Sequence, residues 1–283
     1  MKKLYVIGGA TATGKTAAAI ELAQQLGTEI LSADSRQFYR GMDIGTAKPT
    51  PEELAAVRHH FIDSLDVTQP YSAGDFERDA LRLLARLFEK YDSAVLVGGS
   101  GLFLRAVCEG LDDFPVISPE TQNRVEALEK TGGLAALQAE VGRLDPVQFA
   151  QMDTQNPARL RRVLRVCLES GQPYSTFLAA KKQPRPFTPI YILKELPRPE
   201  LYARINARVD AMVAAGLEEE ARRFLPYRDL PALQTVGYAE WFDFFEGKTS
   251  RAEAIEKIKQ HTRNYAKRQH TWFRQWEGMR IEG

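Results

Sequence analysis

A glycine-rich segment near the N-terminus, residues 9–16, has the residue types and spacing of a phosphate-binding loop. Its sequence, GATATGKT, fits G-x-x-x-x-G-K-[ST] and lies between an apolar run and a helical pattern. In such loops backbone N–H groups and the following helix N-terminus face phosphate oxygens. The lysine adds a positive charge, and the threonine hydroxyl can ligate Mg²⁺. The predicted diphosphate- or nucleotide-binding residues are Gly9, Ala10, Thr11, Ala12, Thr13, Gly14, Lys15 and Thr16.

A carboxylate and a hydroxyl follow two other apolar runs. Asp34 comes after residues 29–33, and ligands of open α/β sheets collect at the carboxyl ends of strands. It could hold a metal or accept a proton, or it could close an Asx turn with Ser35. Residues 94–98 lead into the turn GGSG, where Ser100 could bind a phosphate or simply begin a helix. No acidic residue ends that run, which weakens the ATPase and kinase interpretations.

The apolar pattern indicates which elements position these residues. Runs at 4–8, 29–33, 94–98 and 191–194 predict strands, and periodic segments at 17–26, 73–90, 198–215, 217–225 and 250–275 predict helices. This alternation predicts an α/β fold, a P-loop NTPase-like parallel sheet flanked by helices. Between 113 and 186 the pattern is helical and interrupted by prolines. We predict a catalytic core of residues 1–112 plus 187–283 and an inserted helical domain at 113–186.

Composition excludes several classes of protein. The 283 residues carry a net charge of +1, which excludes a strongly basic, histone-like protein and an acidic disordered chain. The chain contains no apolar run of about 18 residues that would predict a membrane span. Two distant cysteines favour a reducing, cytoplasmic setting, and four histidines without a cysteine cluster argue against a zinc site. The charge is uneven: −6 over 51–113, +6 over 156–185 and +5 over 248–283. The two basic segments suit a polyanionic partner, although solvated helix faces explain them equally well.

Further segments occur in the order known from one enzyme family. They are ADSRQFYRGMDIGTAKPT (33–50), HHFID (59–63), GGSGLFLRAV (98–107), NPARLRRVLRV (156–166), LQTVGY (233–238) and NYAKRQHTWFRQW (264–276). With the phosphate-binding loop, the chain resembles the tRNA dimethylallyltransferases over nearly its whole length. Four positions depart from the usual motifs. Ala10 and Thr13 replace proline and serine, Ser100 replaces threonine, and Phe103 replaces tyrosine, so any role of that phenol is in doubt.

The resemblance implies a reaction, its cofactor and its partners. The dimethylallyl group would pass from dimethylallyl diphosphate to N6 of adenine 37, beside the tRNA anticodon, with Mg²⁺ as cofactor and diphosphate as leaving group. It also implies that Asp34, Ser100 and Arg208 are catalytic, with Asp34 as the base, and that Thr16 ligates the metal. We expect a monomer that binds the anticodon stem-loop. The tRNA-binding residues implied are Asp34, Ser35, Arg36, Gln37, Ala158, Arg159, Leu160, Arg161, Arg162, Gln234, Thr235, Val236, Gly237 and Tyr238.

Several alternatives stay open on the sequence. Arg208 could instead be a surface arginine that pairs with Asp210 or with a neighbouring helix, and spacing alone favours that interpretation. The histidines at 59 and 60 are best interpreted as a structural pair before a strand at 61–62, and the aromatic residues at 272, 273 and 276 as core. The acceptor could be free AMP, ADP or ATP, as in the related adenylate dimethylallyltransferases. A small-molecule kinase and a non-catalytic RNA-binding protein are the remaining alternatives.

Overall fold

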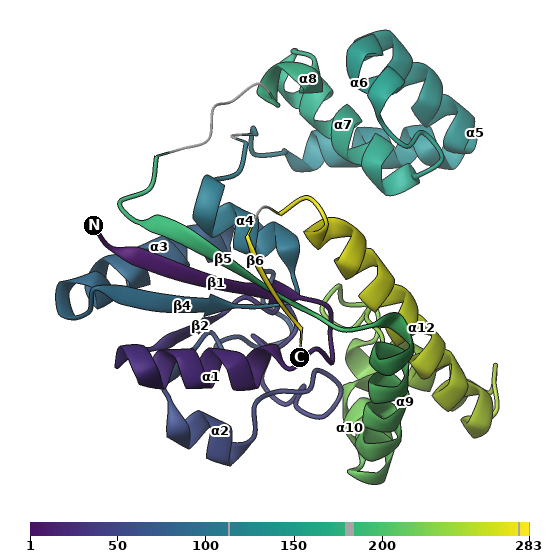
Figure 1. Cartoon of the computed structure of the whole chain (residues 1–283). Coiled ribbons are helices and arrows are strands. Elements are labelled where there is room, and N and C mark those ends of the chain that lie inside the picture. The colour runs from purple at the N-terminus through teal and green to yellow at the C-terminus, as the bar shows by residue number, and fades with distance from the viewer. Residues whose placement is uncertain (113, 179–183, 277, 283) are drawn as a thin grey trace. The chain divides into compact units, whose positions relative to one another are not determined.

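The computed structural model describes residues 1–112, 114–178, 184–276 and 278–282 (Figure 1). The chain forms two compact units. One consists of Met1–Glu109 and Pro184–Gly283, and the other is Gly110–Gln183. The boundaries lie three residues before those expected from the proline pattern at each end of the insertion.

The larger unit is built on a six-stranded sheet whose strand order is β3-β2-β4-β1-β5-β6, with every pair parallel. The predicted α/β fold with a parallel sheet is therefore confirmed. β1 is central, because it pairs with β4 on one side and β5 on the other. The strands are β1 (Lys3–Gly9), β2 (Ile30–Ser32), β3 (His59–His60), β4 (Ser93–Val97), β5 (Thr188–Glu195) and β6 (Met279–Glu282).

Helices cover both faces of this sheet (Figure 1). The predicted helices at 17–26, 73–90, 198–215, 217–225 and 250–275 are confirmed to within two residues at each end. Serine side chains cap two of them, since Ser72 and Ser250 each form a capping box. The helices of this unit are α1 (Lys15–Leu26), α2 (Pro51–Ala56), α3 (Ala73–Lys90), α4 (Gly101–Glu109), α9 (Arg198–Ala214), α10 (Leu217–Phe224), the 3₁₀ turn η1 (Leu225–Tyr227), α11 (Ala239–Phe245) and α12 (Arg251–Phe273).

The strands are apolar on both sides because each face of the sheet packs against helices. Leu4, Val6 and Leu96 join a core with Phe76 of α3, whereas Ile7 belongs to the core on the α1 side. Alternating side chains therefore serve two separate cores, as expected for a parallel sheet buried on both faces. A third core lies among the helices of residues 198–273, and Trp241 and Tyr238 are fully buried in it.

The helical unit has a core of its own. Its longest helix is interrupted at Gly133, whose φ of 59° and ψ of −153° are not helical. Leu160, Leu164 and Val125 are fully buried between the two longest helices. The helices are α5 (Pro119–Leu144), α6 (Pro146–Gln151), α7 (Pro157–Ser170) and α8 (Tyr174–Phe177).

One local prediction is wrong, and another is confirmed. The strand expected at 61–62 is formed instead by His59 and His60, because Phe61 has a φ of 65° and leaves the sheet direction. The interpretation of the C-terminal aromatic residues as core holds, since Phe273 is 1% exposed and packs against Trp276. No helix in the described ranges is both long and apolar enough to cross a membrane.

Candidate functional site

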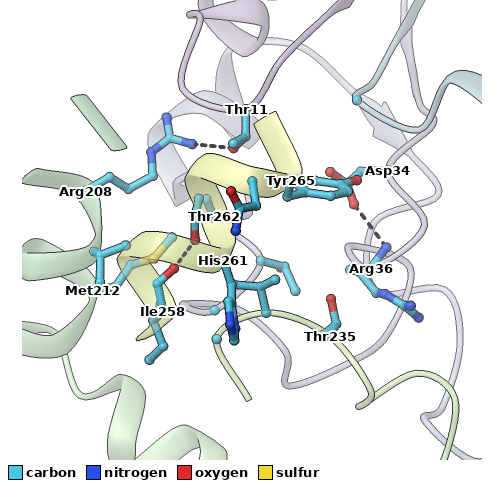
Figure 2. A pocket seen from close by; sticks show the side chains of 18 of the residues that line it. Thr11, Asp34, Arg36, Arg208, Met212, Thr235, Ile258, His261, Thr262 and Tyr265 are labelled. Atoms are coloured by element: carbon cyan, nitrogen blue, oxygen red, sulfur yellow. Dashed lines mark hydrogen bonds between the residues drawn. The ribbon is translucent and has the colours of Figure 1, made fainter. Parts of the chain in front are cut away.

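A cavity of about 610 Å³ lies in the larger unit, beyond the carboxyl ends of β1, β2 and β4. Figure 2 shows side chains that line it. Open α/β sheets bind their ligands at this edge. The walls come from several parts of the chain that are distant in sequence. They include the phosphate-binding loop, residues 34–36, residues 45–47, Gly99, residues 234–237 and 239–240, and one face each of α9 and α12.

The phosphate-binding loop has the strand–loop–helix arrangement predicted for it. β1 ends at Gly9 and α1 begins at Lys15, with Gly14 in the left-handed conformation at the N-cap. A Cβ at Gly14 would meet no atom within 4 Å, so the space beside the helix N-terminus is open. Thr13 is buried, and its hydroxyl donates to the Ala10 carbonyl at 2.8 Å. The loop is thus closed by its own side chains and leaves room for an anion.

Lys15 is the cation of the loop, and it is folded back onto the protein. Its Nζ donates to the Ala10 carbonyl at 2.5 Å. Burial lowers the pKa of Lys15 to about 8; the charge of Asp34 partly opposes this and that of Arg208 adds to it. A desolvated ammonium gains most from an anionic ligand, because the ligand replaces the lost hydration.

Asp34 fits both interpretations offered by the sequence. Its Oδ1 accepts a 3.0 Å hydrogen bond from the Arg36 backbone N–H, which is the predicted Asx turn. The same side chain lines the cavity beside Tyr265 (Figure 2). Burial raises the pKa of Tyr265 to about 12, and the negative charge of Asp34 adds to the increase. The turn therefore fixes a carboxylate at the cavity wall.

The turn after β4 places Ser100 next to the Asp34 segment. The Ser100 Oγ accepts from the Ser35 N–H at 3.3 Å and lies 3.3 Å from the Ser35 Oγ. Ser35 and Gly99 both line the cavity. Phe103, where the family usually has tyrosine, packs in the core with Phe38 and Phe76 at ring distances of 5.6 and 5.5 Å. The Phe103 ring, which lacks the hydroxyl of the usual tyrosine, thus lies in an aromatic cluster.

Arg208 lies at the cavity rather than on the surface. Its Nη1 is 3.3 Å from the Thr11 Oγ1, to which it donates (Figure 2). The alternative pairing with Asp210 is wrong, because Asp210 binds Lys259 at 2.8 Å. Burial lowers the pKa of Arg208. The phosphate-binding loop therefore has two desolvated cations, its own Lys15 and Arg208, which contacts it from α9.

Comparison with known proteins decides the family. Residues 37–276 match the family model described as IPP transferase. The chain belongs to this family. It is 49% identical to a tRNA dimethylallyltransferase of Christiangramia forsetii, covering 96% of this chain and 90% of the relative. It is also 45% identical to that of Cytophaga hutchinsonii, with the same shares covered. The family is one of prenyltransferases.

Solved structures agree with this assignment. A tRNA isopentenylpyrophosphate transferase from Bacillus halodurans is 36% identical, with a TM-score of 0.71. The match covers 100% of this chain and 90% of the B. halodurans chain. The corresponding enzyme of Staphylococcus epidermidis is 30% identical, with a TM-score of 0.70 and coverage of 100% and 93%. A eukaryotic dimethylallyltransferase acting on tRNA has a TM-score of 0.86 at 22% identity and shows the same fold.

The structure divides the tRNA-binding residues implied for this member of the family into two groups. Ser35, Arg36 and residues 234–237 line the cavity. Two others do not present their side chains there. Tyr238 is fully buried and donates to Glu220, and the Gln37 amide donates to the Thr46 and Ala47 carbonyls at 3.1 Å each. For the Gln37 amide nitrogen to donate to a base of the tRNA, both of these hydrogen bonds would have to break.

The residues implied on α7 also differ in exposure. Leu160 is 0% exposed, and its side chain packs in the core of the helical unit. Arg161 binds Glu129 at 2.6 Å and Arg165 binds Glu126 at 3.3 Å, so each of these arginines is paired with a carboxylate of α5. Ala158, Arg159 and Arg162 are exposed, with Arg162 4.8 Å from the centre of the Phe114 ring. Lys181 and Lys182 of the basic segment lie outside the described residues.

Sequence reasoning missed the contribution of α12 to the cavity. His261, Tyr265 and Gln269 all line it (the first two are labelled in Figure 2). They recur every four residues and so lie along one side of the helix. That spacing was the available signal. His261 Nδ1 lies 2.6 Å from Glu240 Oε1, and Glu240 also accepts from the Gly237 N–H at 2.8 Å.

Proposed function

We propose that this member of the family transfers the dimethylallyl group from dimethylallyl diphosphate to N6 of adenine 37 of tRNA, releasing diphosphate. One observation carries the proposal. A single cavity joins a phosphate-binding loop and two desolvated cations with a carboxylate on the same wall. Such a cavity provides for a diphosphate leaving group and for removal of a proton from the acceptor.

The donor side would stabilise the leaving diphosphate. As the C1–O bond of the donor breaks, negative charge develops on the bridging and terminal oxygens. The N–H groups at the start of α1, Lys15 and Arg208 face this region and would stabilise that charge. Thr16 is the second residue of α1, and its hydroxyl suits Mg²⁺, which is usually bound by one or two protein oxygens, waters and substrate phosphates. When bound, Mg²⁺ would add Lewis-acid stabilisation there.

The acceptor side would place adenine against Asp34. N6 attacks C1 of the dimethylallyl group as the diphosphate leaves, and the Asp34 carboxylate takes the proton that N6 loses. An adenine in the anticodon loop must be extruded to reach the cavity. Arg36 and residues 234–237 line the same cavity and offer side-chain and backbone groups to a splayed base. Ser100, bonded to Ser35, would orient this wall.

The helical unit would contribute further contacts to the anticodon stem-loop. Arg159, exposed in the first turn of α7, is a cation suited to a phosphate. We further propose a cytoplasmic monomer, in keeping with the two free, buried cysteines.

A transfer experiment tests the proposed function. Purified protein is incubated with Mg²⁺, labelled dimethylallyl diphosphate and either unmodified tRNA or AMP. Label in tRNA alone is expected. Label in AMP would move the acceptor to a free nucleotide, and ATP consumption without transfer of label would indicate a kinase instead.

A further inference from the structure

One side chain of α12 connects the two loops that form the cavity floor. Gln269 accepts a 2.9 Å hydrogen bond at Oε1 from the Thr11 N–H in the phosphate-binding loop. Its Nε2 donates a second 2.9 Å bond to the carbonyl of Gly99, the residue before Ser100. The side chain is 6% exposed, so both bonds are shielded from water. The amide oxygen and the amide nitrogen thus each have a partner, as expected for a buried polar side chain.

The fit between α12 and the Gly99 turn is close. A Cβ at Gly99 would collide with the Gln269 amide nitrogen, and a Cβ at Gly101 would collide with the Trp272 indole. Gln269 and Trp272 are three residues apart and share one face of the helix. The glycines of the turn therefore let this helical face press directly onto the backbone that carries Ser100.

The bond to Thr11 also restricts which loop amides are available to a phosphate. Gln269 takes the Thr11 N–H, and Arg208 donates to the Thr11 hydroxyl at 3.3 Å. Thr11 is thus held at both its backbone and its side chain. The phosphate is left to the later amides of the loop and to Lys15.

We propose that Gln269 is a positioning residue that sets the distance between the diphosphate site and the Asp34–Ser100 wall. The inference rests on the proposed function, because only a reaction between two substrates requires the two loops to be held in register. Gln269 acts through the loops, since both ends of its amide are occupied by backbone groups. Misplacement by about 1 Å can cost roughly 10²-fold in rate. Loss of Gln269 should therefore slow transfer much more than it weakens donor binding.

Two substitutions separate the two bonds. Gln269→Met keeps the length of the side chain and removes both bonds. Gln269→Glu can still accept from Thr11 but cannot donate to Gly99. Gln260→Met is the matched control, because Gln260 is exposed on the same helix. Each variant is compared with the wild type in donor binding, single-turnover transfer to tRNA, melting temperature and amide exchange of the peptides containing Thr11 and Gly99.

The expected results differ between the variants. Gln269→Met should bind dimethylallyl diphosphate within about threefold of wild type yet transfer about 10²-fold more slowly, with faster exchange at Thr11. Gln269→Glu should transfer slowly but keep Thr11 protected. Gln260→Met should match the wild type.

A wild-type rate in Gln269→Met, or equal losses of binding and rate, would overturn the proposal. Unchanged exchange at Thr11 would do so as well. Failure of the wild type to modify tRNA would instead overturn the proposed function. The exchange measurement would still test whether Gln269 holds the Thr11 and Gly99 loops.

Discussion

The Tyr238 phenol donates a 2.6 Å hydrogen bond to Oε1 of Glu220, and both side chains are buried. Glu220 also accepts from the N–H groups of Asp43, Ile44 and Gly45 at 2.9–3.1 Å. One carboxylate on α10 thus ties the loop at 43–47 to the segment at 233–238, and residues from both line the cavity. Burial, reinforced by the Glu220 charge, raises the pKa of Tyr238.

Tyr238→Phe should destabilise the protein by about 1.5–3 kcal/mol, because it removes a hydrogen bond to a buried charged acceptor. Urea unfolding measures the change. Tyr227→Phe is the control, since Tyr227 is 45% exposed. Equal stability of both variants would contradict the structural role of the Tyr238 phenol.

Asp34→Asn should lower the single-turnover transfer rate by about 10²–10⁴-fold, because the amide cannot take the N6 proton. Affinity for tRNA should change by less than about threefold. The matched variant Asp229→Asn removes an exposed aspartate of the same unit and should transfer at the wild-type rate. An unchanged rate in Asp34→Asn would show that another group accepts the proton.

The lowered pKa of Lys15 predicts a pH dependence of donor use. Below about pH 7 the free enzyme carries a charged ammonium that binds the diphosphate directly. Above about pH 8 the lysine is increasingly neutral, so donor binding must take up a proton. The kcat/KM for dimethylallyl diphosphate should then be flat at lower pH and fall by up to about tenfold per pH unit above 8. Lys15→Arg keeps its charge and should lose this decline; an identical profile in both proteins would exclude Lys15 as its source.

Arg159 and Arg161 should respond differently to replacement by alanine. Loss of the exposed Arg159 should weaken tRNA binding and reduce the slope of affinity against salt by about one, as expected for a phosphate contact. Arg161 is paired with Glu129 at 2.6 Å, so its loss should cost up to about 1 kcal/mol of stability and leave the salt slope unchanged. Binding titrations between 50 and 200 mM salt compare them, and a reversed order would place the tRNA on another face.

Local patterns were sufficient for β1, β2, β4 and β5 and for the phosphate-binding loop, since strand, glycine turn and helix follow one another directly. They placed β3 two residues too late and did not predict β6. They also pointed to Asp34 and Ser100, which follow the carboxyl ends of β2 and β4. Glu220 was not predictable, because the backbone N–H groups that it binds lie 175 to 177 residues away and nothing in its own segment indicates burial. Leu160 shows the opposite case. The family resemblance placed it among the tRNA-binding residues, whereas its side chain is fully buried in the helical core.

The central place of β1 has a consequence for how the chain acquires its structure. Lys3 pairs with both Ser93 and Thr188, so one edge of the first strand has its partner within the first hundred residues and the other does not. During synthesis that second edge stays unpaired until the whole helical unit has left the ribosome. Contacts of such long sequence separation form slowly, and unpaired strand edges promote aggregation. The helical unit, with its own local core, can fold first, and the nascent N-terminal strands must stay soluble until β5 arrives.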